Sequence, residues 1–211
     1  MKFVFDLDGT LSFDGMTMDK HLQEVLLSAP SYGHEVIFAT ARSYRDSLGI
    51  LEGNLAELAI VGLNGGTVHK QGNLVSQYSL HDEALQAILD LCRTYNIPYF
   101  IDNAFDYALQ NPEQIPFISL VDPMHKAKAK SIQELSAPVK AVLALAEHQD
   151  ILEDIINQLA QPKSLDLIYQ EQEKCLYINP KGVTKASTVL NHFGPDYIAF
   201  GNDKSDIPLF R

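Results

Sequence analysis

Residues 2–11 read KFVFDLDGTL, an apolar run that passes directly into two acidic residues. The run predicts a buried strand over 2–5, and because side chains alternate along a strand, Asp6 and Asp8 can project to one side while Leu7 returns to the core. Two converging carboxylates repel each other unless a cation, a shared proton or a raised pKa relieves the repulsion. Each of these remedies is typical of catalytic chemistry, so we expect a site at the end of this strand.

The composition excludes several classes of protein. A chain of 211 residues can bury a hydrophobic core without disulfides, and its two cysteines, Cys92 and Cys175, lie too far apart for a zinc or thiol redox motif. Acidic residues outnumber basic ones by 27 to 16, and the net charge of -11 argues against nucleic acid or an anionic membrane surface as a partner. Because no apolar run is long enough to span a membrane, we expect a cytoplasmic protein.

Strand and helix signals alternate in the first part of the chain. After the strand over 2–5 come a helix over 18–29, a strand over 35–39, a helix from about residue 43 and a strand over 58–61. This βαβαβ order predicts an α/β fold with a Rossmann-like parallel sheet and helices on its faces. Two shorter strands over 67–69 and 74–78 read as a hairpin that leaves the sheet.

A different pattern runs from about residue 80 to 179. A helix followed by two strands occurs twice, and we predict a mostly antiparallel sheet with helices on one face. The predicted elements are 82–95, 98–101 and 105–109, then 148–160, 164–169 and 174–178, with a further strand over 139–145. We therefore predict an α+β domain over 80–179 inserted into a core formed by 1–79 and 180–211, where the α/β pattern resumes with a helix capped by Thr184 and a strand over 197–200.

Polar side chains follow three of the apolar strands. Parallel strands bring their carboxyl ends to one edge of a sheet, so these side chains should gather there. They are Asp6 and Asp8 after the first strand, Thr40 after the second, and Asn202, Asp203 and Asp206 after the last. An oxygen-rich cluster without histidine or cysteine suits Mg²⁺, which leaves a coordination position for a substrate phosphate.

A phosphate bound at this edge needs compensation beyond the metal. Lys185 at a helix start can supply charge, and Thr40 can supply a hydrogen-bond donor. Asp6 can then attack phosphorus and form an aspartyl-phosphate. Asp8 can give a proton to the leaving oxygen and take one from the hydrolytic water, provided that Asp6 and local desolvation raise its pKa.

The motifs, taken in order, resemble those of the haloacid dehalogenase superfamily, and in particular its Cof-type phosphatases, over nearly the whole chain. The matching stretches are residues 6–11, 39–42, 64–66, 182–185 and 201–206. The resemblance implies that Asp6 is the nucleophile and Asp8 the acid/base, and that Thr40 and Lys185 hold the phosphoryl group. It also implies that Asn64 lines the phosphate site and that the insert is a cap domain that supplies most substrate discrimination.

The sequence departs from the family pattern in its last motif. The family usually has Gly-Asp-x-x-Asn-Asp, whereas here Asn202 replaces the first Asp and Ser205 the Asn, and the sequence printed stops soon afterwards at Arg211. We expect a weakened or rearranged metal site, with Asp6, Asp8, Asn202 and Asp203 as its candidate ligands. Asp206 keeps its place and is expected to support Lys185 or the metal's water shell.

These features favour a Mg²⁺-dependent phosphatase that hydrolyses a small phosphorylated metabolite, for example a sugar phosphate. One alternative is a degenerate relative that binds a phosphorylated ligand without efficient turnover, which the changes at Asn202 and Ser205 motivate. Another is a phosphotransferase or mutase, which uses the same core residues. Arg42 is open between two roles of equal weight, reaching the substrate or bracing neighbouring loops.

Overall fold

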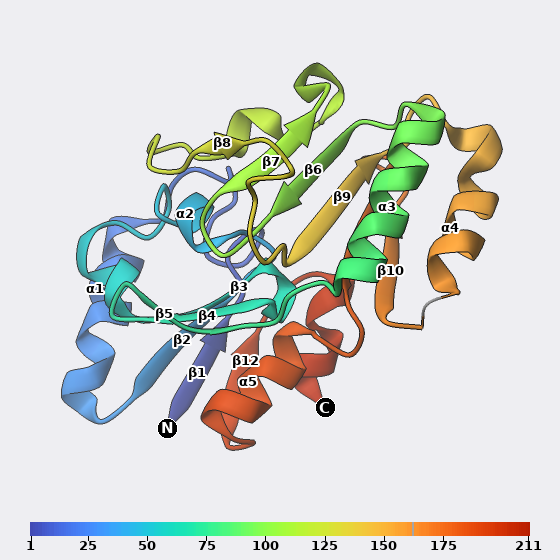
Figure 1. Cartoon of the computed structure of the whole chain (residues 1–211). Helices are drawn as coiled ribbons and strands as arrows, with labels where there is room; N and C mark the ends of the chain where they lie inside the picture. The colour runs from blue at the N-terminus through green and yellow to red at the C-terminus, as the bar shows by residue number, and fades with distance from the viewer. Residues whose placement is uncertain (162) are drawn as a thin grey trace. The chain divides into compact units, whose positions relative to one another are not determined.

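The computed structural model describes residues 1–161 and 163–211, which divide into two compact units (Figure 1). The first unit comprises residues 1–77, 122–126 and 183–211, and the second comprises 78–121 and 127–182. Each unit is built on its own sheet of six strands. The observed architecture is the predicted α/β core with an α+β insert, although the functional division into catalytic core and cap remains a prediction.

The sheet of the first unit has the strand order β12-β1-β2-β3-β4-β5. Its strands are β1 (Lys2–Phe5), β2 (Glu35–Ala39), β3 (Ala59–Gly62), β4 (Thr67–Lys70), β5 (Asn73–Gln77) and β12 (Tyr197–Phe200). The first four strands in this order pair in parallel, which confirms the parallel sheet predicted from the βαβαβ pattern. β3 is buried at every position, because a parallel sheet is covered on both faces.

The hairpin of β4 and β5 extends this sheet. β4 pairs antiparallel with β3, and β5 pairs antiparallel with β4. Our prediction that the hairpin leaves the sheet was therefore wrong. The side chains of Thr67, Val68 and His69 are all buried in β4, so pairing with the open edge of β3 removes apolar surface from water and provides partners for the strand's backbone groups.

Helices flank the sheet of the first unit. They are α1 (Lys20–Ser28), η1 (Ala29–Tyr32), α2 (Tyr44–Ser47), η2 (Gly53–Glu57), η3 (Leu63–Gly65), α5 (Lys185–Phe193) and η7 (Lys204–Phe210). α5 packs Ala186, Val189 and Phe193 against the apolar side chains of one sheet face. Thr184 caps this helix as predicted, because its hydroxyl accepts from the Ser187 N–H while the Ser187 hydroxyl accepts from the Thr184 N–H.

The second unit has the strand order β10-β11-β9-β6-β7-β8. Its elements are α3 (Asp82–Tyr95), β6 (Tyr99–Asp102), β7 (Tyr107–Gln110), η4 (Pro112–Gln114), η5 (Ile118–Leu120), β8 (Ala129–Lys130), β9 (Lys140–Ala144), η6 (Gln149–Ile151), α4 (Leu152–Ala160), β10 (Leu165–Gln170) and β11 (Cys175–Pro180). Every pairing is antiparallel except that of β7 with β8, which confirms the predicted mostly antiparallel sheet.

The helices α3 and α4 lie side by side along one face of the second sheet (Figure 1). Ile88 of α3 and Leu159 of α4 are fully buried against strand residues such as Leu143 and Leu176, which project to the same face. Phe100 of β6 projects to the opposite face and packs with Phe117 from the segment after β7. The predicted placement of both helices on one face is therefore confirmed.

Residues 122–126 belong to the first unit, although the chain on both sides of them belongs to the second. The Asp122 N–H donates to Asp46 Oδ1 at 2.8 Å, and the Lys126 N–H donates to Asp122 Oδ1 at 2.8 Å. Asp46 is itself buried and accepts from the Arg45 guanidinium and the Ser43 hydroxyl. The second unit is therefore formed by two separate segments of the chain. Our prediction of one uninterrupted domain over 80–179 did not include this interruption.

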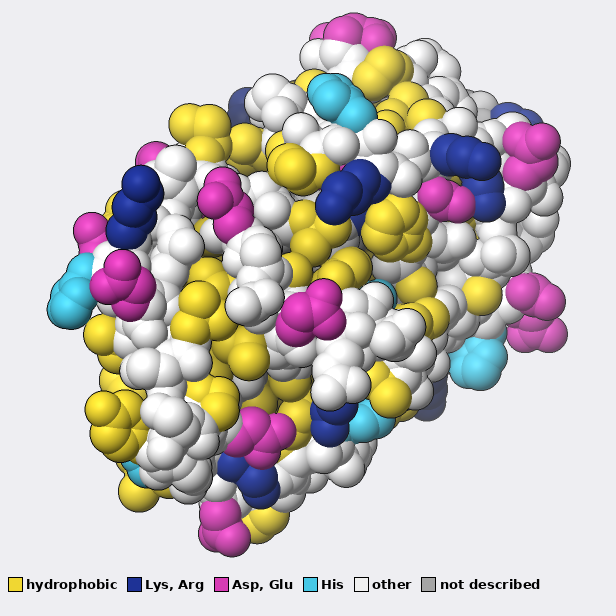
Figure 2. Space-filling view, turned by 90° about the vertical axis from the view of Figure 1, so that its left-hand side faces the viewer, with side chains coloured by type: hydrophobic (Ala, Val, Ile, Leu, Met, Phe, Trp, Pro, Cys, Tyr) yellow, Lys and Arg dark blue, Asp and Glu magenta, His cyan; other side chains and the backbone are white. Residues whose placement is uncertain are grey.

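The surface is mixed in character. On the face drawn in Figure 2, hydrophobic side chains are interspersed with acidic and basic ones. Cys92 and Cys175 are both buried as free thiols. Of the helices in residues 1–161 and 163–211, none is long and apolar enough to cross a membrane.

The packing of α4 gives a stability prediction. Leu159 is fully buried, so Leu159→Ala should lower the free energy of unfolding by about 2–5 kcal/mol, since it removes apolar contacts and leaves a cavity. Gln158 precedes it on the same helix and is exposed, so Gln158→Ala should change the free energy by less than about 0.5 kcal/mol. Urea titration of both variants measures the difference, and equal effects would contradict the observed orientation of α4.

Candidate active site

The carboxyl ends of the parallel strands bring the predicted site residues to one edge of the first unit's sheet. Directly after β1, the Asp6 N–H donates to the carbonyl of Phe200 at the end of β12. Directly after β2, the Thr40 N–H donates to the carbonyl of Val61 in β3. The Asn64 N–H then donates to the Thr40 carbonyl at 3.0 Å, so backbone hydrogen bonds join the end of β1 to that of β12 and the end of β2 to that of β3.

A buried cation lies between two carboxylates at this edge. Lys185 Nζ donates to Asp6 Oδ1 at 2.6 Å and to Asp206 Oδ1 at 2.8 Å, and all three side chains are almost fully buried. Asp206 Oδ2 accepts from the backbone N–H groups of Asn202 and Asp203. The ammonium has three N–H donors, and with two of them on carboxylates the third remains for another acceptor. The structure therefore places Asp206 as the support of Lys185, one of the two roles predicted for it.

Burial governs the protonation of Asp6. Removal from water raises the pKa of its carboxyl above 3.8, although the attraction and hydrogen bond of Lys185 act in the opposite direction. The nearby charge of Asp206 raises the pKa further. The single ammonium thus does not fully compensate the two carboxylates, and the site favours additional positive charge.

The amide of Asn202 faces two oxygen atoms of the first motif. One of the two terminal atoms of this amide, its oxygen or its nitrogen, lies 2.9 Å from the Asp8 carbonyl oxygen and 3.2 Å from Asp6 Oδ2. With its nitrogen turned to this position the amide donates to both oxygens and to Thr10 Oγ1. With its oxygen there, the amide oxygen lies 2.9 Å from the Asp8 carbonyl oxygen and 3.2 Å from Asp6 Oδ2, and carboxylate, amide and carbonyl oxygens are the donor types that Mg²⁺ prefers. These donors therefore fit Mg²⁺.

The other two predicted ligands point elsewhere. The carboxylate of Asp203 accepts from the backbone N–H of Lys204 and caps η7. The carboxylate of Asp8 is paired with Arg42. Among residues 1–161 and 163–211, no three or more side chains of His, Cys, Asp and Glu are grouped so as to hold a metal ion. A metal site at this edge would therefore depend on the amide of Asn202 and on backbone oxygen in addition to Asp6.

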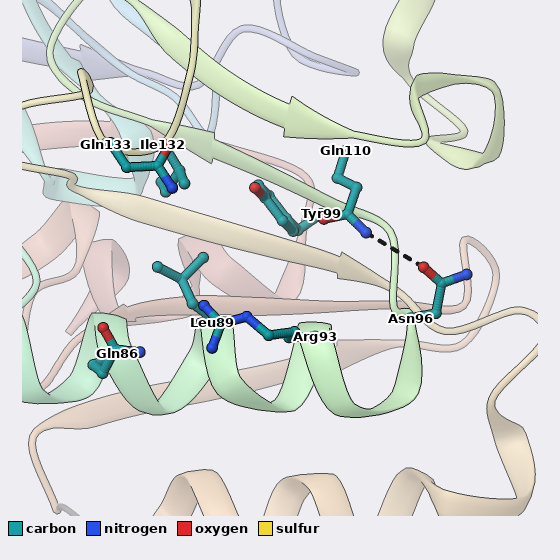
Figure 3. A pocket seen from close by; sticks show the side chains of 8 residues that line it. All are labelled: Gln86, Leu89, Arg93, Asn96, Tyr99, Gln110, Ile132 and Gln133. Atoms are coloured by element: carbon teal, nitrogen blue, oxygen red, sulfur yellow. Dashed lines mark hydrogen bonds between the residues drawn. The ribbon is translucent and has the colours of Figure 1, made fainter.

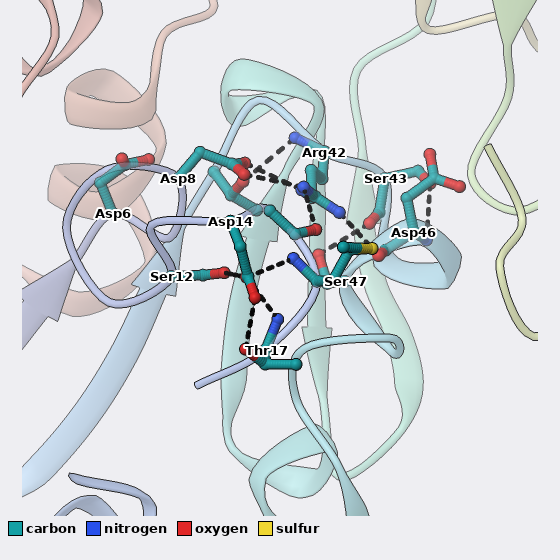
Figure 4. Close-up of polar contacts among 12 residues, drawn as sticks. Asp6, Asp8, Ser12, Asp14, Thr17, Arg42, Ser43, Asp46 and Ser47 are labelled. Atoms are coloured by element: carbon teal, nitrogen blue, oxygen red, sulfur yellow. Dashed lines mark hydrogen bonds and ion pairs between the residues drawn. The ribbon is translucent and has the colours of Figure 1, made fainter. Parts of the chain in front are cut away.

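The carboxylate of Asp8 faces Arg42 (Figure 4). Arg42 Nε donates to Asp8 Oδ2 at 2.8 Å, and Arg42 Nη2 donates to Asp8 Oδ1 at 2.7 Å. Asp6 and Asp8 therefore contact different cations, Lys185 and Arg42, in addition to the remedies that the sequence left open. The roles weighed for Arg42 at the sequence level were substrate contact and loop bracing, and neither included this pairing.

Thr40 and Asn64 lie beside each other in the same edge. Thr40 is fully buried, and its hydroxyl accepts from the backbone N–H of Arg42 at 3.1 Å, which leaves the hydroxyl proton for another acceptor. Asn64 has a left-handed backbone conformation, with φ of 57°. Its Oδ1 is buried and has no hydrogen-bond partner among the described residues. Both side chains are thus placed in the edge with unused hydrogen-bonding capacity.

A surface pocket of about 500 Å³ lies within the second unit (Figure 3). Its lining includes Arg93 and Asn96 at the end of α3, with Tyr99 on β6 and Gln110 on β7. None of the residues predicted from the sequence lines it. Arg93 is engaged by Asp90 at 3.0 Å and is largely exposed, so the pocket shows no buried charge that would mark it as catalytic.

Comparison with known proteins identifies the class to which this fold and this site belong. The family model of haloacid dehalogenase-like hydrolases matches residues 3–211. The chain therefore belongs to the haloacid dehalogenase-like hydrolases, which confirms the resemblance seen in its motifs.

Several relatives are similar over almost the whole chain. It is 25% identical over 224 residues to 5-amino-6-(5-phospho-D-ribitylamino)uracil phosphatase YitU from Bacillus subtilis, with 98% of this chain and 81% of the relative covered. It is 23% identical over 217 residues to a phosphoglycolate phosphatase from Nitrosopumilus maritimus, with 99% and 78% covered. A haloacid dehalogenase-like hydrolase from Bacteroides thetaiotaomicron has a similar solved structure, with a TM-score of 0.80, 17% identity, and 98% and 83% of the two chains covered.

The raised pKa of Asp6 gives a prediction about stability. A carboxyl whose pKa is higher in the folded than in the unfolded state binds more protons when folded, so folding loses free energy as pH rises from about 3.8 through the folded pKa. Asp6→Asn removes this loss and should be more stable than the parent at pH 7 without divalent metal. Thermal unfolding should show the gain shrinking toward pH 4. A variant less stable than the parent at pH 7 would mean that the Lys185 attraction outweighs burial.

Proposed function

We propose that this protein is a Mg²⁺-dependent phosphatase that hydrolyses a small phosphorylated metabolite through an aspartyl-phosphate. The observation that carries the proposal is the buried Lys185 ammonium on Asp6, whose other carboxylate oxygen faces the Asn202 amide beside the Asp8 carbonyl oxygen. This arrangement offers a carboxylate nucleophile, a cation for phosphoryl oxygens and a hard oxygen site for a metal. The membership of the family supports the same reading.

The first chemical step uses Asp6 and Asp8. A carboxylate oxygen of Asp6 bonds to phosphorus while the bond from phosphorus to the leaving oxygen breaks, and protonated Asp8 gives its proton to that oxygen. In the second step a water bonds to phosphorus, the bond to Asp6 breaks, and Asp8 takes the proton of the water. Inorganic phosphate leaves, and both side chains return to their starting states.

The surrounding residues hold the phosphoryl group. The third N–H of Lys185 and the hydroxyl of Thr40 are donors for phosphoryl oxygens, and the amide NH₂ of Asn64 is proposed as a further donor, as the family resemblance implies. Asp6, Asn202 and the Asp8 carbonyl would hold Mg²⁺, with Asp203 kept as a predicted ligand from the sequence. A bound Mg²⁺ neutralises charge that develops on the phosphoryl oxygens.

The relatives and the composition support a small phosphorylated metabolite as the substrate class. The two named relatives are phosphatases of small metabolites, and a sugar phosphate is one example of the class that we propose. The second unit is proposed to act as the cap domain that discriminates among substrates. The net charge of -11 disfavours nucleic acid or an anionic membrane as a partner, and we propose a cytoplasmic location.

Replacement of the nucleophile tests the proposal. Asp6→Asn should lower phosphate release from a panel of phosphorylated metabolites by about 10³-fold or more, because an amide oxygen is a poor nucleophile. Asp19→Asn is the matched control, since Asp19 is exposed and Asn keeps its capping role on α1. Assays are run with and without Mg²⁺. Activity that persists in Asp6→Asn would refute the assigned nucleophile, and activity that persists in EDTA would refute the metal dependence.

A second candidate function is binding of a phosphorylated ligand without efficient turnover. The observation that favours it is again Asn202, because its amide can satisfy the Asp6 and Asp8 oxygens without any metal. A site that needs no cation to be stable can lose its metal and keep its fold.

Restoring the carboxylate distinguishes the two functions. Asn202→Asp places a negative charge beside Asp6, so without metal the variant should unfold at a lower temperature than the parent. Mg²⁺ should bind the variant about tenfold or more tightly, since a carboxylate is a stronger ligand than an amide. Calorimetric titration measures the affinity, and unchanged Mg²⁺ binding would contradict the proposed ligand set. A large gain in phosphatase rate would indicate a decayed site, whereas unchanged and robust activity would favour the enzyme.

A further inference from the structure

The guanidinium of Arg42 holds both oxygens of the Asp8 carboxylate, and we propose that Arg42 is the positioning residue that aims Asp8 for proton transfer. The inference rests on the proposed function, in which Asp8 is the acid/base. The two hydrogen bonds, at 2.8 and 2.7 Å, form a fork that fixes the plane of the carboxylate. Each oxygen keeps a second lone pair, so the fork sets the direction in which Asp8 can carry a proton.

Arg42 is held in place by the backbone as well as by Asp8. Its Nη2 also donates to the Gly15 carbonyl at 2.7 Å, and its Nη1 donates to the Asp46 carbonyl at 3.4 Å. The Arg42 side chain is only 12% exposed, whereas that of Asp8 is 46% exposed. The backbone carbonyls thus orient Arg42, which is the more buried partner. Arg42 in turn orients the more exposed carboxylate of Asp8.

The Gly15 carbonyl belongs to a tight turn whose backbone N–H groups are held by the side chain of Asp14. Asp14 Oδ1 accepts from the N–H groups of Met16 and Thr17 at 2.8 Å each, and Asp14 Oδ2 accepts from the Thr17 hydroxyl at 2.6 Å. These hydrogen bonds, with the Thr17 hydroxyl first, hold the pKa of Asp14 well below its usual value, so the turn keeps its charged acceptor at neutral pH. Asp14 therefore holds the turn that places the Gly15 carbonyl, this carbonyl accepts from Arg42, and Arg42 donates to Asp8.

Gly15 leaves room for this contact. Its φ is +70°, and a Cβ added there would lie 3.0 Å from Arg42 Nη2 and 3.7 Å from Asp8 Oδ1. Gly33 has nearly the same backbone conformation, with φ of +74°, but an added Cβ would meet no atom within 4 Å. Alanine at either glycine imposes the same kind of backbone strain, and only alanine at Gly15 displaces the guanidinium.

A positioning role and a purely structural brace differ in how they depend on the leaving group. p-Nitrophenolate is weakly basic and departs with little help from an acid, whereas the alkoxide of glycerol 2-phosphate needs a proton. Single-turnover release of the leaving group isolates the step in which Asp8 is the acid. A brace for the loops would slow both substrates by the same factor.

The test measures that release for both substrates in Arg42→Ala, Arg42→Lys, Gly15→Ala and Gly33→Ala, with Mg²⁺ present. We expect Arg42→Ala to slow glycerol 2-phosphate about tenfold or more beyond its effect on p-nitrophenyl phosphate, with little change in KM, because the loss concerns proton transfer and not binding. Arg42→Lys should recover part of the rate, since an ammonium can hold one oxygen. Gly15→Ala should shift the substrate ratio in the same direction, and Gly33→Ala should leave it unchanged.

The outcomes separate this inference from the proposed function. Equal slowing of both substrates by Arg42→Ala, or an unchanged ratio in Gly15→Ala with the fold intact, overturns the positioning role. If Asp8→Asn keeps the full rate with glycerol 2-phosphate, the acid/base assignment fails first, and the role of Arg42 fails with it. If Asp8→Asn is selectively slow with glycerol 2-phosphate while Arg42→Ala is not, the proposed function stands and only the positioning role is lost.

Discussion

The ammonium of Lys185 lies between the carboxylates of Asp6 and Asp206, and this buried group of charges joins three distant parts of the chain. Burying an ion pair costs several kcal/mol of desolvation for each ion, so such a group is a poor source of stability. The arrangement is better understood as a functional one. Asp206 and Lys185 are compensated by each other and by backbone N–H groups, and Asp6 is left under-compensated, with a raised pKa. Burial thereby keeps the pKa of Asp6 raised although Lys185 donates to it.

The second carboxylate of the motif has a different environment although it is only two residues away. Asp6 is buried beside Lys185, whereas Asp8 is half exposed and gripped by Arg42. Two identical functional groups can serve different roles when their surroundings differ, and a nucleophile and an acid/base are such roles. Assigning one cation to each carboxylate also avoids direct competition between them for one partner. The difference in environment therefore comes from Lys185 on α5 and Arg42 after β2, not from the Asp-x-Asp spacing itself, and it suits the two roles proposed for this pair.

The sheet and its edge could be predicted from the sequence because they follow from local patterns and one topological rule. Apolar runs marked the parallel strands, and parallel strands must end at a common edge. The hairpin of β4 and β5 could not be placed in the same way, because its pairing with β3 depends on which sheet edge is open. The return of residues 122–126 to the first unit depends on buried contacts of Asp46, which carry no periodic signal.

The site shows the same limit at the level of single side chains. Thr40 and Lys185 were predicted because one directly follows a strand and the other begins a helix, whereas Asn64 was predicted only from the family resemblance. The pairing of Arg42 with Asp8 joins residues 34 positions apart and depends on where a turn puts the Gly15 carbonyl, so spacing alone could not reveal it. Asn202 and Asp203 are neighbours and could not be ranked as ligands from sequence. The two side chains differ in orientation because of η7. The Asp203 carboxylate accepts from the first N–H of η7, whereas the Asn202 amide faces Asp6.

The replacement of a carboxylate by the Asn202 amide changes what the site requires to be stable. An amide can turn either its nitrogen or its oxygen toward Asp6 Oδ2 and the Asp8 carbonyl, so the same side chain can donate to them or join them as a ligand. A carboxylate at this position has no donor to offer, and it would leave two anions and a carbonyl facing one another until a cation arrived. Asparagine therefore lets the edge of the sheet satisfy its polar groups without metal, and it does so by giving up one negative charge that would attract Mg²⁺. The orientation of this one amide therefore decides whether it donates hydrogen bonds to these oxygens or joins them as the proposed metal ligand.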